Sequence, residues 1–490
     1  MEDAKESQWT GLEPGRGFGT GRARAVFHVA VALAAGLALR VWMLAKFFAV
    51  SGDSLVYGGL AKNLLLHGRY ALSLPSGEMY PTLIRLPGYP LLLALCFRLF
   101  GMENYFSAAC VQVALDLLSC LLLADFARLI APAHSNPSAA FSALWLAALC
   151  PFTASYAAIP LTETATICML SLAMWAMARF RRQPSWNNAL CFTFAVTYAA
   201  LLRPDGALAA VAFAPALFAG LPRGEGPGRI QGRKLAVMTV VCAALALAPF
   251  GAWAARNWRV FHVFEALAPR SATDPGDSPN PGWQRWVKTW CLDFASTSQI
   301  YWNVEGDKLD VSELPSRAFD SSAQFAETAA LAAKYNSNGY GLTPEIDAGF
   351  ARLAEERIAA HPLRYYVWLP LGRLADMALR PRVENLPIDL DWWVYAHHHA
   401  ETEFSWAYAG LNAVYLLLGL AGLCLRPRFW AALAAYMALR SALLLTIEAP
   451  ETRYTLECFP MLIAAGAVAI TEGRNRWICK PAMDKDSAQY

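Results

Sequence analysis

Residues 50–65 read VSGDSLVYGGLAKNLL and directly follow the first long apolar run of the chain. A helix that begins at Asp53 places this acid and Tyr57 on one face, because positions i and i+4 lie on the same side of a helix. The acid has two interpretations. Asp is a favoured N-cap residue, so Asp53 can simply cap the helix. Alternatively, its carboxylate serves a site at the exit of the first membrane span.

The composition excludes an ordinary soluble protein. Of the 490 residues, 56% are hydrophobic and only 16% are charged, whereas about 25% are charged in soluble domains. The formal net charge is +3 and the basic residues are dispersed, so no nucleic-acid partner is expected. Most of the cysteines lie in apolar runs without a CxxC pair, which indicates neither a disulfide framework nor a thiolate metal site.

The apolar runs predict an all-α polytopic membrane protein with about ten transmembrane helices, each of about 20 residues. The expected spans are 25–48, 106–130, 139–159, 163–180, 187–202, 205–221, 235–255, 406–425, 428–447 and 453–471. The apolar run at 89–100 is too short, because at 1.5 Å per residue it reaches only about 18 Å. We expect it to lie in the outer interface.

The basic residues orient this arrangement. With ten spans and a cytoplasmic N-terminus, four basic clusters face the cytoplasm, as the positive-inside rule requires. These are Arg179/Arg181/Arg182, Arg223/Arg229/Arg233/Lys234, Arg426/Arg428 and Arg474/Arg476/Lys480. We therefore expect a multi-pass protein of the plasma (inner) membrane, with its polar loops and its chemistry on the extracytoplasmic face.

The spans and loops predict five segments. They are a cytoplasmic tail (1–24), a transmembrane core (25–255) containing the first outer loop (49–105), an extracytoplasmic loop region (256–405), C-terminal transmembrane helices (406–472) and a second tail (473–490). Residues 269–342 are rich in Pro, Gly, Ser and Asp and are expected to order on acceptor binding. Thr343 is expected to cap a helix that ends at His361, and residues 364–379 an interfacial amphipathic helix.

Several motifs follow one another along the chain. After Asp53 comes YxxLAxNLLxxGxY from Tyr57, and then RLPGYPLLLAL from Arg85. Later motifs are LTETATICML (161–170), LLRPDG (201–206), AARNWRVF (254–261), AHPLRYYVWLPLGR (360–373) and PETRYTLECFP (450–460). In this order, over about residues 50–460, they resemble GT-C membrane glycosyltransferases. The nearest branch is family-39-like and includes aminoarabinose transferases, rhizobial lipopolysaccharide-core transferases and protein O-mannosyltransferases.

The resemblance implies a GT-C-type bundle with interfacial helices in its first outer loop. It implies transfer of a sugar, with inversion, from a polyprenyl-phosphate donor to a hydroxyl of a glycan, lipid or protein acceptor. Such a reaction needs a base for the acceptor and positive charge for the departing phosphate. A transporter or flippase of lipid-linked sugars is the alternative, since it needs the same cationic groove but no base. An inactive acceptor-binding subunit is a third interpretation.

The resemblance also assigns the site residues. Asp53 would be the base, Glu163 a second acid that orients the site or holds a metal, and Arg85 the leading phosphate ligand, because a guanidinium pairs bidentately with phosphate. The further substrate-binding candidates are Tyr57, Tyr89, Arg203, Arg256, Arg453 and Tyr454.

Each assignment has a purely structural alternative. Arg85 can be an interfacial snorkelling arginine, and Glu163 can stabilise the dipole at a helix N-terminus. The remaining arginines can pair with neighbouring acids, namely Asp205, Glu448 and Glu451.

Metal binding is left open by the sequence. The candidate ligands for a divalent ion are Asp53, Glu163 and the tract His397–His399, although successive histidines cannot all point at one ion from a regular element. Two charges lie within apolar runs, Asp116 and Arg440, and such charges are functional candidates by default. A buried polar contact explains each of them equally well, with Gln112 for Asp116 and with Glu448 for Arg440. The loop tryptophans suit an interface belt and sugar stacking alike; they are Trp283, Trp286, Trp290, Trp302, Trp392 and Trp393.

Overall fold

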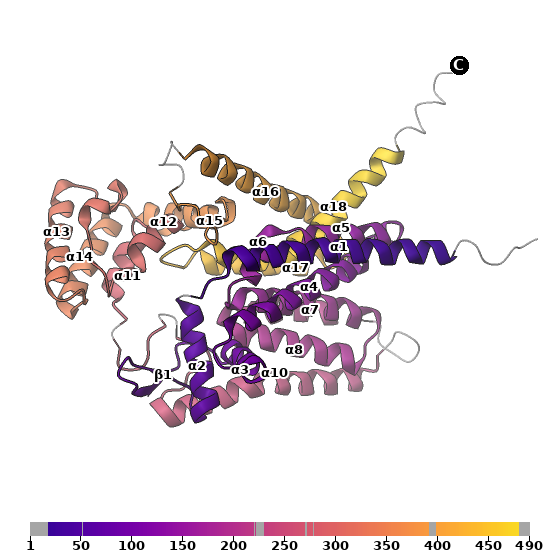
Figure 1. The fold of residues 1–490 in the computed structure, drawn as a ribbon, viewed down its shortest axis with the longest axis horizontal. Helices are drawn as coiled ribbons and strands as arrows, with labels where there is room; N and C mark the ends of the chain where they lie inside the picture. The colour runs from indigo at the N-terminus through magenta and orange to yellow at the C-terminus, as the bar shows by residue number, and fades with distance from the viewer. Residues whose placement is uncertain are drawn as a thin grey trace, which may run out of the picture.

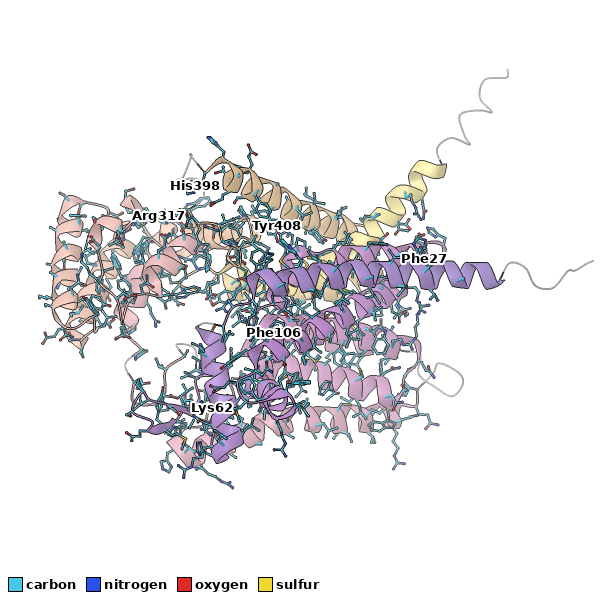
Figure 2. All side chains as sticks on the ribbon, in the orientation of Figure 1. Phe27, Lys62, Phe106, Arg317, His398 and Tyr408 are labelled. Atoms are coloured by element: carbon cyan, nitrogen blue, oxygen red, sulfur yellow. The ribbon has the colours of Figure 1, made fainter. Side chains whose placement is uncertain are left out.

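The computed structural model describes residues 18–50, 52–219, 221, 230–269, 272–277, 279–391 and 398–479. It consists of a bundle of long helices with a smaller helical group, α11 to α14, at one end (Figure 1). Large apolar side chains project from the bundle surface, such as Phe27, which is 66% exposed, and Phe106, which is 51% exposed (Figure 2). This is the arrangement expected of a surface that faces lipid rather than water.

All ten segments predicted to span the membrane contain helix. The helices are α1 (Phe18–Phe47), α4 (Tyr105–Ile130), α5 (Asn136–Ala148) with α6 (Pro151–Ala157), α7 (Thr162–Arg182), α8 (Trp186–Leu202), α9 (Leu208–Phe218), α10 (Gly232–Phe261), α16 (His399–Cys424), α17 (Trp430–Leu444) and α18 (Phe459–Cys479). Within the described residues, five helices are long and apolar enough to cross a membrane, or six if α5 and α6, bent by 52°, form one span. The predicted helical membrane fold is therefore confirmed, while the count of ten spans stays a prediction.

Helix α7 occupies the middle of the bundle. It contacts α4, α8 and α9, and most of its residues from Thr162 to Phe180 are buried. The packing of α16 on α18 is equally close, since a Cβ atom at Gly422 would lie 1.9 Å from the Ala465 carbonyl oxygen. The C-terminal helices therefore pack closely on each other.

The first outer loop begins with α2 (Asp53–His67), followed by the antiparallel strands β1 (Ala71–Ser73) and β2 (Met79–Pro81) and the short helix α3 (Gly88–Phe100). The predicted start at Asp53 and the short helix near 89–100 are both confirmed. The interpretation of Asp53 as an N-cap is wrong: Gly52 takes the cap position and no side chain caps the helix. Helix α2 ends at Gly68, whose φ of 65° gives the left-handed conformation that glycine tolerates.

Residues of the predicted acceptor-ordered segment fold around a core of their own. Helices α11 (Pro281–Lys288), α12 (Phe294–Ser296) and α13 (Ser322–Ser337) belong to this region, and α11 and α13 pack on α14 (Pro344–Ala360). Trp283, Trp286 and Trp290 are each at most 3% exposed within that core. These three tryptophans therefore serve neither an interface belt nor sugar stacking, and the expectation of order only on acceptor binding is wrong. Trp392 and Trp393 lie outside the described residues.

The two predicted helices after residue 342 are present. The Thr343 hydroxyl accepts a hydrogen bond from the Ile346 amide at 3.3 Å, so Thr343 caps α14 as expected. A π-helical turn (Arg364–Trp368) leads into α15 (Leu369–Leu379), and Trp368 is 67% exposed on it. An exposed indole at this place suits a helix that lies on a membrane surface.

Two buried charges have partners other than those predicted. Asp116 pairs with Arg40 at 2.6 Å rather than with Gln112, and both side chains are almost fully buried. Arg440 pairs with Asp205, and with Glu457 at 3.1 Å, rather than with Glu448. A buried charge requires a counter-charge in contact. In both cases tertiary packing supplies this counter-charge, and the polar residue expected from its nearness in the sequence is not the partner.

One carboxylate in α15 predicts a pH dependence of stability. Burial raises the pKa of Asp376 to about 6, against attraction by Arg380. Because the folded state binds the proton of Asp376 more tightly than the unfolded state, protonation of this carboxyl group stabilises the fold. The stabilisation is complete below about pH 4 and is lost as the pH rises through about 6. The shift corresponds to about 3 kcal/mol. Unfolding followed between pH 4 and 7 should show this slope, and Asp376→Asn should remove it while the exposed Glu356→Gln leaves it unchanged. An unaltered slope in Asp376→Asn contradicts the assignment.

Candidate active site

A cavity of about 1280 Å³ opens where the first outer loop meets the α6–α7 turn, the α8–α9 turn and the segment before α18. Four of the predicted site residues that line it are cationic or acidic, namely Asp53, Arg85, Arg203 and Arg453, and two are tyrosines, Tyr57 and Tyr454. Asp53 and Arg453 are separated by 400 residues in the chain, yet their side chains touch. The fold therefore gathers most of the candidate residues at one place.

Asp53 lies between two guanidinium groups. Its Oδ1 accepts a hydrogen bond from Arg85 Nη2 at 2.7 Å, and its Oδ2 accepts one from Arg453 Nη2 at 3.2 Å. Burial alone would raise the pKa of the carboxyl group, but the charges of Arg85 and Arg453 outweigh it and hold the pKa below its ordinary value. Asp53 is therefore ionised, with each oxygen facing one arginine.

Arg85 is turned into the cavity. Besides Asp53, its guanidinium contacts the carbonyl oxygen of Ile84 at 3.3 Å, while its buried Nε has no hydrogen-bond partner among the described residues. A snorkelling arginine places its charged end at the membrane surface, whereas this guanidinium is paired with a carboxylate in the cavity wall. Among the described residues, this Nε–H is therefore a donor directed at no protein group.

Tyr57 and Tyr89 differ in their exposure to the cavity. Tyr57 lines it, and burial raises the pKa of its hydroxyl to about 12, so it stays protonated. The Arg85 guanidinium lies 5.9 Å from the centroid of the Tyr57 ring. Tyr89 lies behind Tyr57, with ring centroids 5.1 Å apart, and donates a hydrogen bond to Gln112 at 2.5 Å. Tyr89 thus supports Tyr57 and is not a lining residue.

Glu163 stands in the first turn of α7 and is 1% exposed. Its Oε1 accepts a hydrogen bond from Arg203 at 3.0 Å and lies 3.7 Å from Arg453 Nε. The residue therefore fits its predicted place at a helix N-terminus, and it also holds two of the cavity arginines. It does not itself line the cavity, although its neighbour Thr162 does.

The other arginines of the cavity are paired with acids, as the structural alternative expected. Arg203 Nε lies 3.3 Å from Asp205 and 3.1 Å from Glu457. Arg453 also contacts Glu451, and Tyr454 donates a hydrogen bond to the same carboxylate. Positive and negative charges are thereby interleaved around the cavity rather than segregated.

Arg256 is not part of the cavity. Its guanidinium donates to the carbonyl oxygens of Thr82 and Tyr70, both at 2.8 Å, and lies over the Trp253 ring. Both carbonyl groups belong to the first outer loop, and Arg256 belongs to α10. These hydrogen bonds therefore fix the loop to that helix. The predicted place of Arg256 in the substrate site is wrong.

Sequence reasoning missed a second polar group in the cavity. Glu384 and Asn385 lie between α15 and α16 and line it, together with Tyr156 of α6, which donates a hydrogen bond to Glu384 Oε1 at 2.9 Å. The stretch RPRVENLPID has no helical or strand periodicity that would mark it. Only the tertiary fold brings it to the site.

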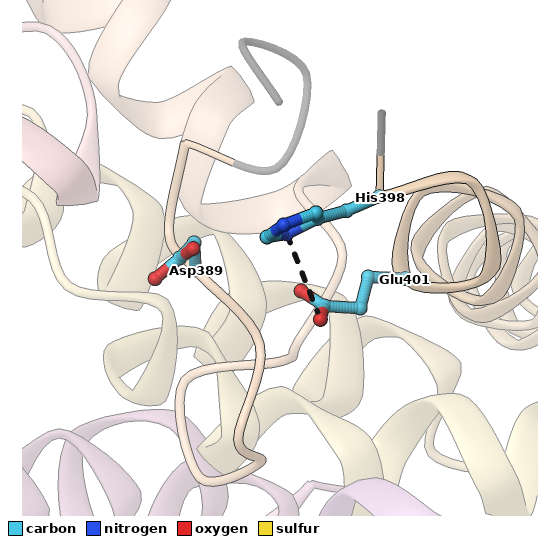
Figure 3. A group of neighbouring side chains, drawn as sticks. All are labelled: Asp389, His398 and Glu401. Atoms are coloured by element: carbon cyan, nitrogen blue, oxygen red, sulfur yellow. Dashed lines mark ion pairs between the residues drawn. The ribbon is translucent and has the colours of Figure 1, made fainter. Parts of the chain in front are cut away.

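Asp53 and Glu163, the two acids predicted as metal ligands, are both paired with arginines. Both oxygens of Asp53 face guanidinium groups, and Oε1 of Glu163 is bound by Arg203, so cations already occupy the positions that a metal would need. In the described part of the chain, Asp389, His398 and Glu401 have ligand atoms within 4.8 Å of one another. Figure 3 shows the His398 ring between the two acids, with Nδ1 3.8 Å from Glu401. His397 lies outside the described residues, and His399 is not part of this group.

Comparison with known proteins gives one family match. Residues 84–253 match the family described as dolichyl-phosphate-mannose-protein mannosyltransferase. This match confirms the resemblance to GT-C membrane glycosyltransferases over α3 to α10. No curated protein matches the sequence.

The solved structures to which the chain is similar include proteins of two organisms. The oligosaccharyltransferase of Archaeoglobus fulgidus, tethered to an acceptor peptide, has 13% identity and a TM-score of 0.49 over 94% of this chain and 51% of its own. The same enzyme in complex with an inhibitory peptide and dolichol-phosphate has 12% identity and a TM-score of 0.49, and the match covers 96% of this chain and 53% of its own. ArnT of Cupriavidus metallidurans, bound to undecaprenyl phosphate, has 16% identity and a TM-score of 0.38, and the match covers 93% of this chain and 78% of its own. The chain spans about half the length of the oligosaccharyltransferase.

Proposed function

We propose that this chain is a membrane glycosyltransferase of the GT-C superfamily, which transfers a sugar from a polyprenyl-phosphate donor to an acceptor hydroxyl with inversion. One observation carries the proposal: a single ionised carboxylate, Asp53, is held between two guanidinium groups at the wall of a large cavity. A carboxylate can accept the acceptor's proton, and the guanidinium groups can bind the phosphate that leaves.

The donor phosphate would bind to Arg85 and Arg453. In the described part of the chain, the buried Nε–H of Arg85 is a donor without a partner. Guanidinium groups form strong charge-assisted hydrogen bonds with phosphate oxygens. Apolar residues also line the cavity, among them Ile84, Leu208 and Leu443. They would accommodate the lipid end of the donor.

The pairing of Asp53 suggests how donor binding would prepare the base. A phosphate that shares the two guanidinium groups weakens their hold on the carboxylate, and its own negative charge raises the proton affinity of Asp53. The acceptor oxygen then attacks the anomeric carbon from the face opposite the phosphate, and its proton passes to Asp53. The bond from that carbon to the phosphate oxygen breaks, and the electron pair leaves with the polyprenyl phosphate.

Glu163 and Arg203 would act indirectly. Glu163 contacts both Arg203 and Arg453, so it would hold the phosphate-binding arginine in place without touching the substrate. Tyr57 and Tyr454 would border the substrate from the cavity wall.

The membrane orientation is part of the proposal. Glu163 is in the first turn of α7, and Arg179, Arg181 and Arg182 are in its last turn, about 24–29 Å away at 1.5 Å per residue. If these arginines face the cytoplasm, as the positive-inside rule favours, the cavity opens on the extracytoplasmic face of the plasma membrane.

Removing either phosphate-binding arginine should weaken donor binding. We expect Arg85→Gln and Arg453→Gln to bind undecaprenyl phosphate about tenfold to a hundredfold more weakly, the usual loss for a charge-assisted hydrogen bond. Binding is measured with the purified protein in nanodiscs. Arg98→Gln, which neutralises an exposed arginine of α3, is the matched control and should bind as the wild type. Equal affinities in all four proteins would contradict the assignment.

The activity itself is tested by reconstitution with radiolabelled undecaprenyl-phosphate mannose or glucose and hydroxyl acceptors: octyl glycosides and a peptide containing Ser and Thr. Formation of a glycosylated acceptor with release of undecaprenyl phosphate supports the function. Movement of the intact lipid-linked sugar across the bilayer without a product would instead support the transporter alternative.

A further inference from the structure

Glu384 differs from the other acids that line the cavity. Asp53, Asp205 and Glu451 each contact at least one arginine. Glu384 accepts a hydrogen bond from the neutral Tyr156 hydroxyl at 2.9 Å, and no ion pair involves it among the described residues. Its second oxygen, Oε2, is buried and has no hydrogen-bond partner in that part of the chain.

The adjacent Asn385 has a matching free group. Its amide Nδ2 is also buried without a partner among the residues that the structure describes, and the residue lines the same cavity. Buried polar atoms in folded proteins are almost always hydrogen-bonded. Two neighbouring side chains with unfilled positions, one an acceptor and one a donor, therefore indicate a polar ligand in the cavity.

The chemistry of the pair selects a sugar rather than a phosphate. A carboxylate repels a phosphate anion, whereas it accepts a hydrogen bond from a hydroxyl group. A carboxylate oxygen and an amide nitrogen on consecutive residues can bind neighbouring hydroxyls of one ring, the first as acceptor and the second as donor. Trp302 also lines the cavity and is 48% exposed, so its ring offers an apolar face to the carbon side of a sugar.

We propose that Glu384 and Asn385 form a sugar-binding subsite, in which they bind two hydroxyls of a sugar ring while Tyr156 orients the carboxylate. This inference rests on the proposed transfer reaction and adds specificity residues to it. The bound ring belongs either to the donor or to the acceptor, since both must enter the cavity. Arg85 and Arg453 serve the phosphate, and Glu384 and Asn385 serve the hydroxyls.

The test compares lipids with and without a sugar. Wild type, Glu384→Gln, Asn385→Ala and the control Glu356→Gln, an exposed acid of α14, are titrated with undecaprenyl phosphate and with undecaprenyl-phosphate mannose or glucose. The KM for an octyl glycoside acceptor is measured alongside. We expect undecaprenyl phosphate to bind all four proteins equally. For Glu384→Gln and Asn385→Ala, we expect one of two changes: either the affinity for the glycosylated lipid falls about tenfold, or the KM for the acceptor rises about tenfold. Tenfold is the usual effect of one hydrogen bond.

The quantity that changes identifies the sugar. Weaker binding of the glycosylated lipid alone assigns the subsite to the donor sugar, and a raised acceptor KM at unchanged kcat and donor affinity assigns it to the acceptor. Tyr156→Phe should produce a smaller change in the same quantity, because it only orients Glu384. The assignment of the subsite is wrong if the donor affinity and the acceptor KM both stay at their wild-type values. It is also wrong if the affinity for undecaprenyl phosphate without a sugar falls to the same extent. A wild-type protein that binds neither lipid overturns the transfer function itself.

Discussion

Replacing Asp53 with asparagine should lower the rate of sugar transfer by about 10²- to 10⁴-fold, the usual contribution of a general base. Asn is nearly isosteric with Asp and can still accept a hydrogen bond from Arg85, so the cavity keeps its shape. The binding of undecaprenyl phosphate should be kept or become tighter, because Arg85 and Arg453 no longer have a competing carboxylate. The measurement is single-turnover transfer together with lipid binding on the same preparation.

The matched control for this variant is Glu78→Gln, which neutralises an exposed acid in the same outer loop. It should transfer sugar at the wild-type rate. Wild-type turnover in Asp53→Asn would exclude Asp53 as the base. A parallel loss of lipid binding and turnover would show that Asp53 serves only to hold the arginines.

Removal of Asp116 should destabilise the fold by about 3–5 kcal/mol, the range for breaking a buried ion pair. Arg40 donates to Asp116 at 2.7 Å and to the carbonyl oxygens of Ala148 and Ala147, and its side chain is fully buried. In Asp116→Ala the guanidinium keeps the carbonyls but loses its counter-charge inside the bundle. Equilibrium unfolding in mixed micelles measures the difference.

Two further variants separate charge from packing. Arg40→Met combined with Asp116→Leu removes both charges, and it should recover most of the lost stability, because apolar replacement of a buried pair is often neutral or stabilising. Glu103→Gln, which breaks the exposed pair with Lys62, should cost less than about 1 kcal/mol. If Asp116→Ala costs no more than Glu103→Gln, the buried pair is not a source of stability.

The local features of the fold follow from the sequence because their causes are local. The apolar runs predict where the helices lie, and the length of the run at 89–100 predicts the short helix α3. Thr343 followed by Pro344 defines the start of α14 through a hydrogen bond within one turn. The start of α2 at Asp53 is predicted as well, but Gly52 takes the cap position there and no side chain caps the helix.

The partners of the charged residues do not follow from local pattern. The neighbours considered for Asp116 and Arg440 were near in sequence, whereas the actual partners, Arg40 and Asp205, are 76 and 235 residues away. Burial requires each charge to be compensated, but only the packing decides by which residue. Arg256 carries the same motif-based expectation as Arg453, yet one binds loop carbonyls and the other enters the cavity.

A structure of the protein in nanodiscs with undecaprenyl phosphate would show whether Arg85 and Arg453 bind the donor phosphate next to Asp53. We expect the phosphate inside the cavity beside Asp53, with its oxygens about 3 Å from guanidinium nitrogens of Arg85 and Arg453, the distance of a charge-assisted hydrogen bond. A phosphate bound away from this cavity, with the contacts from Asp53 to both arginines unchanged, would contradict it.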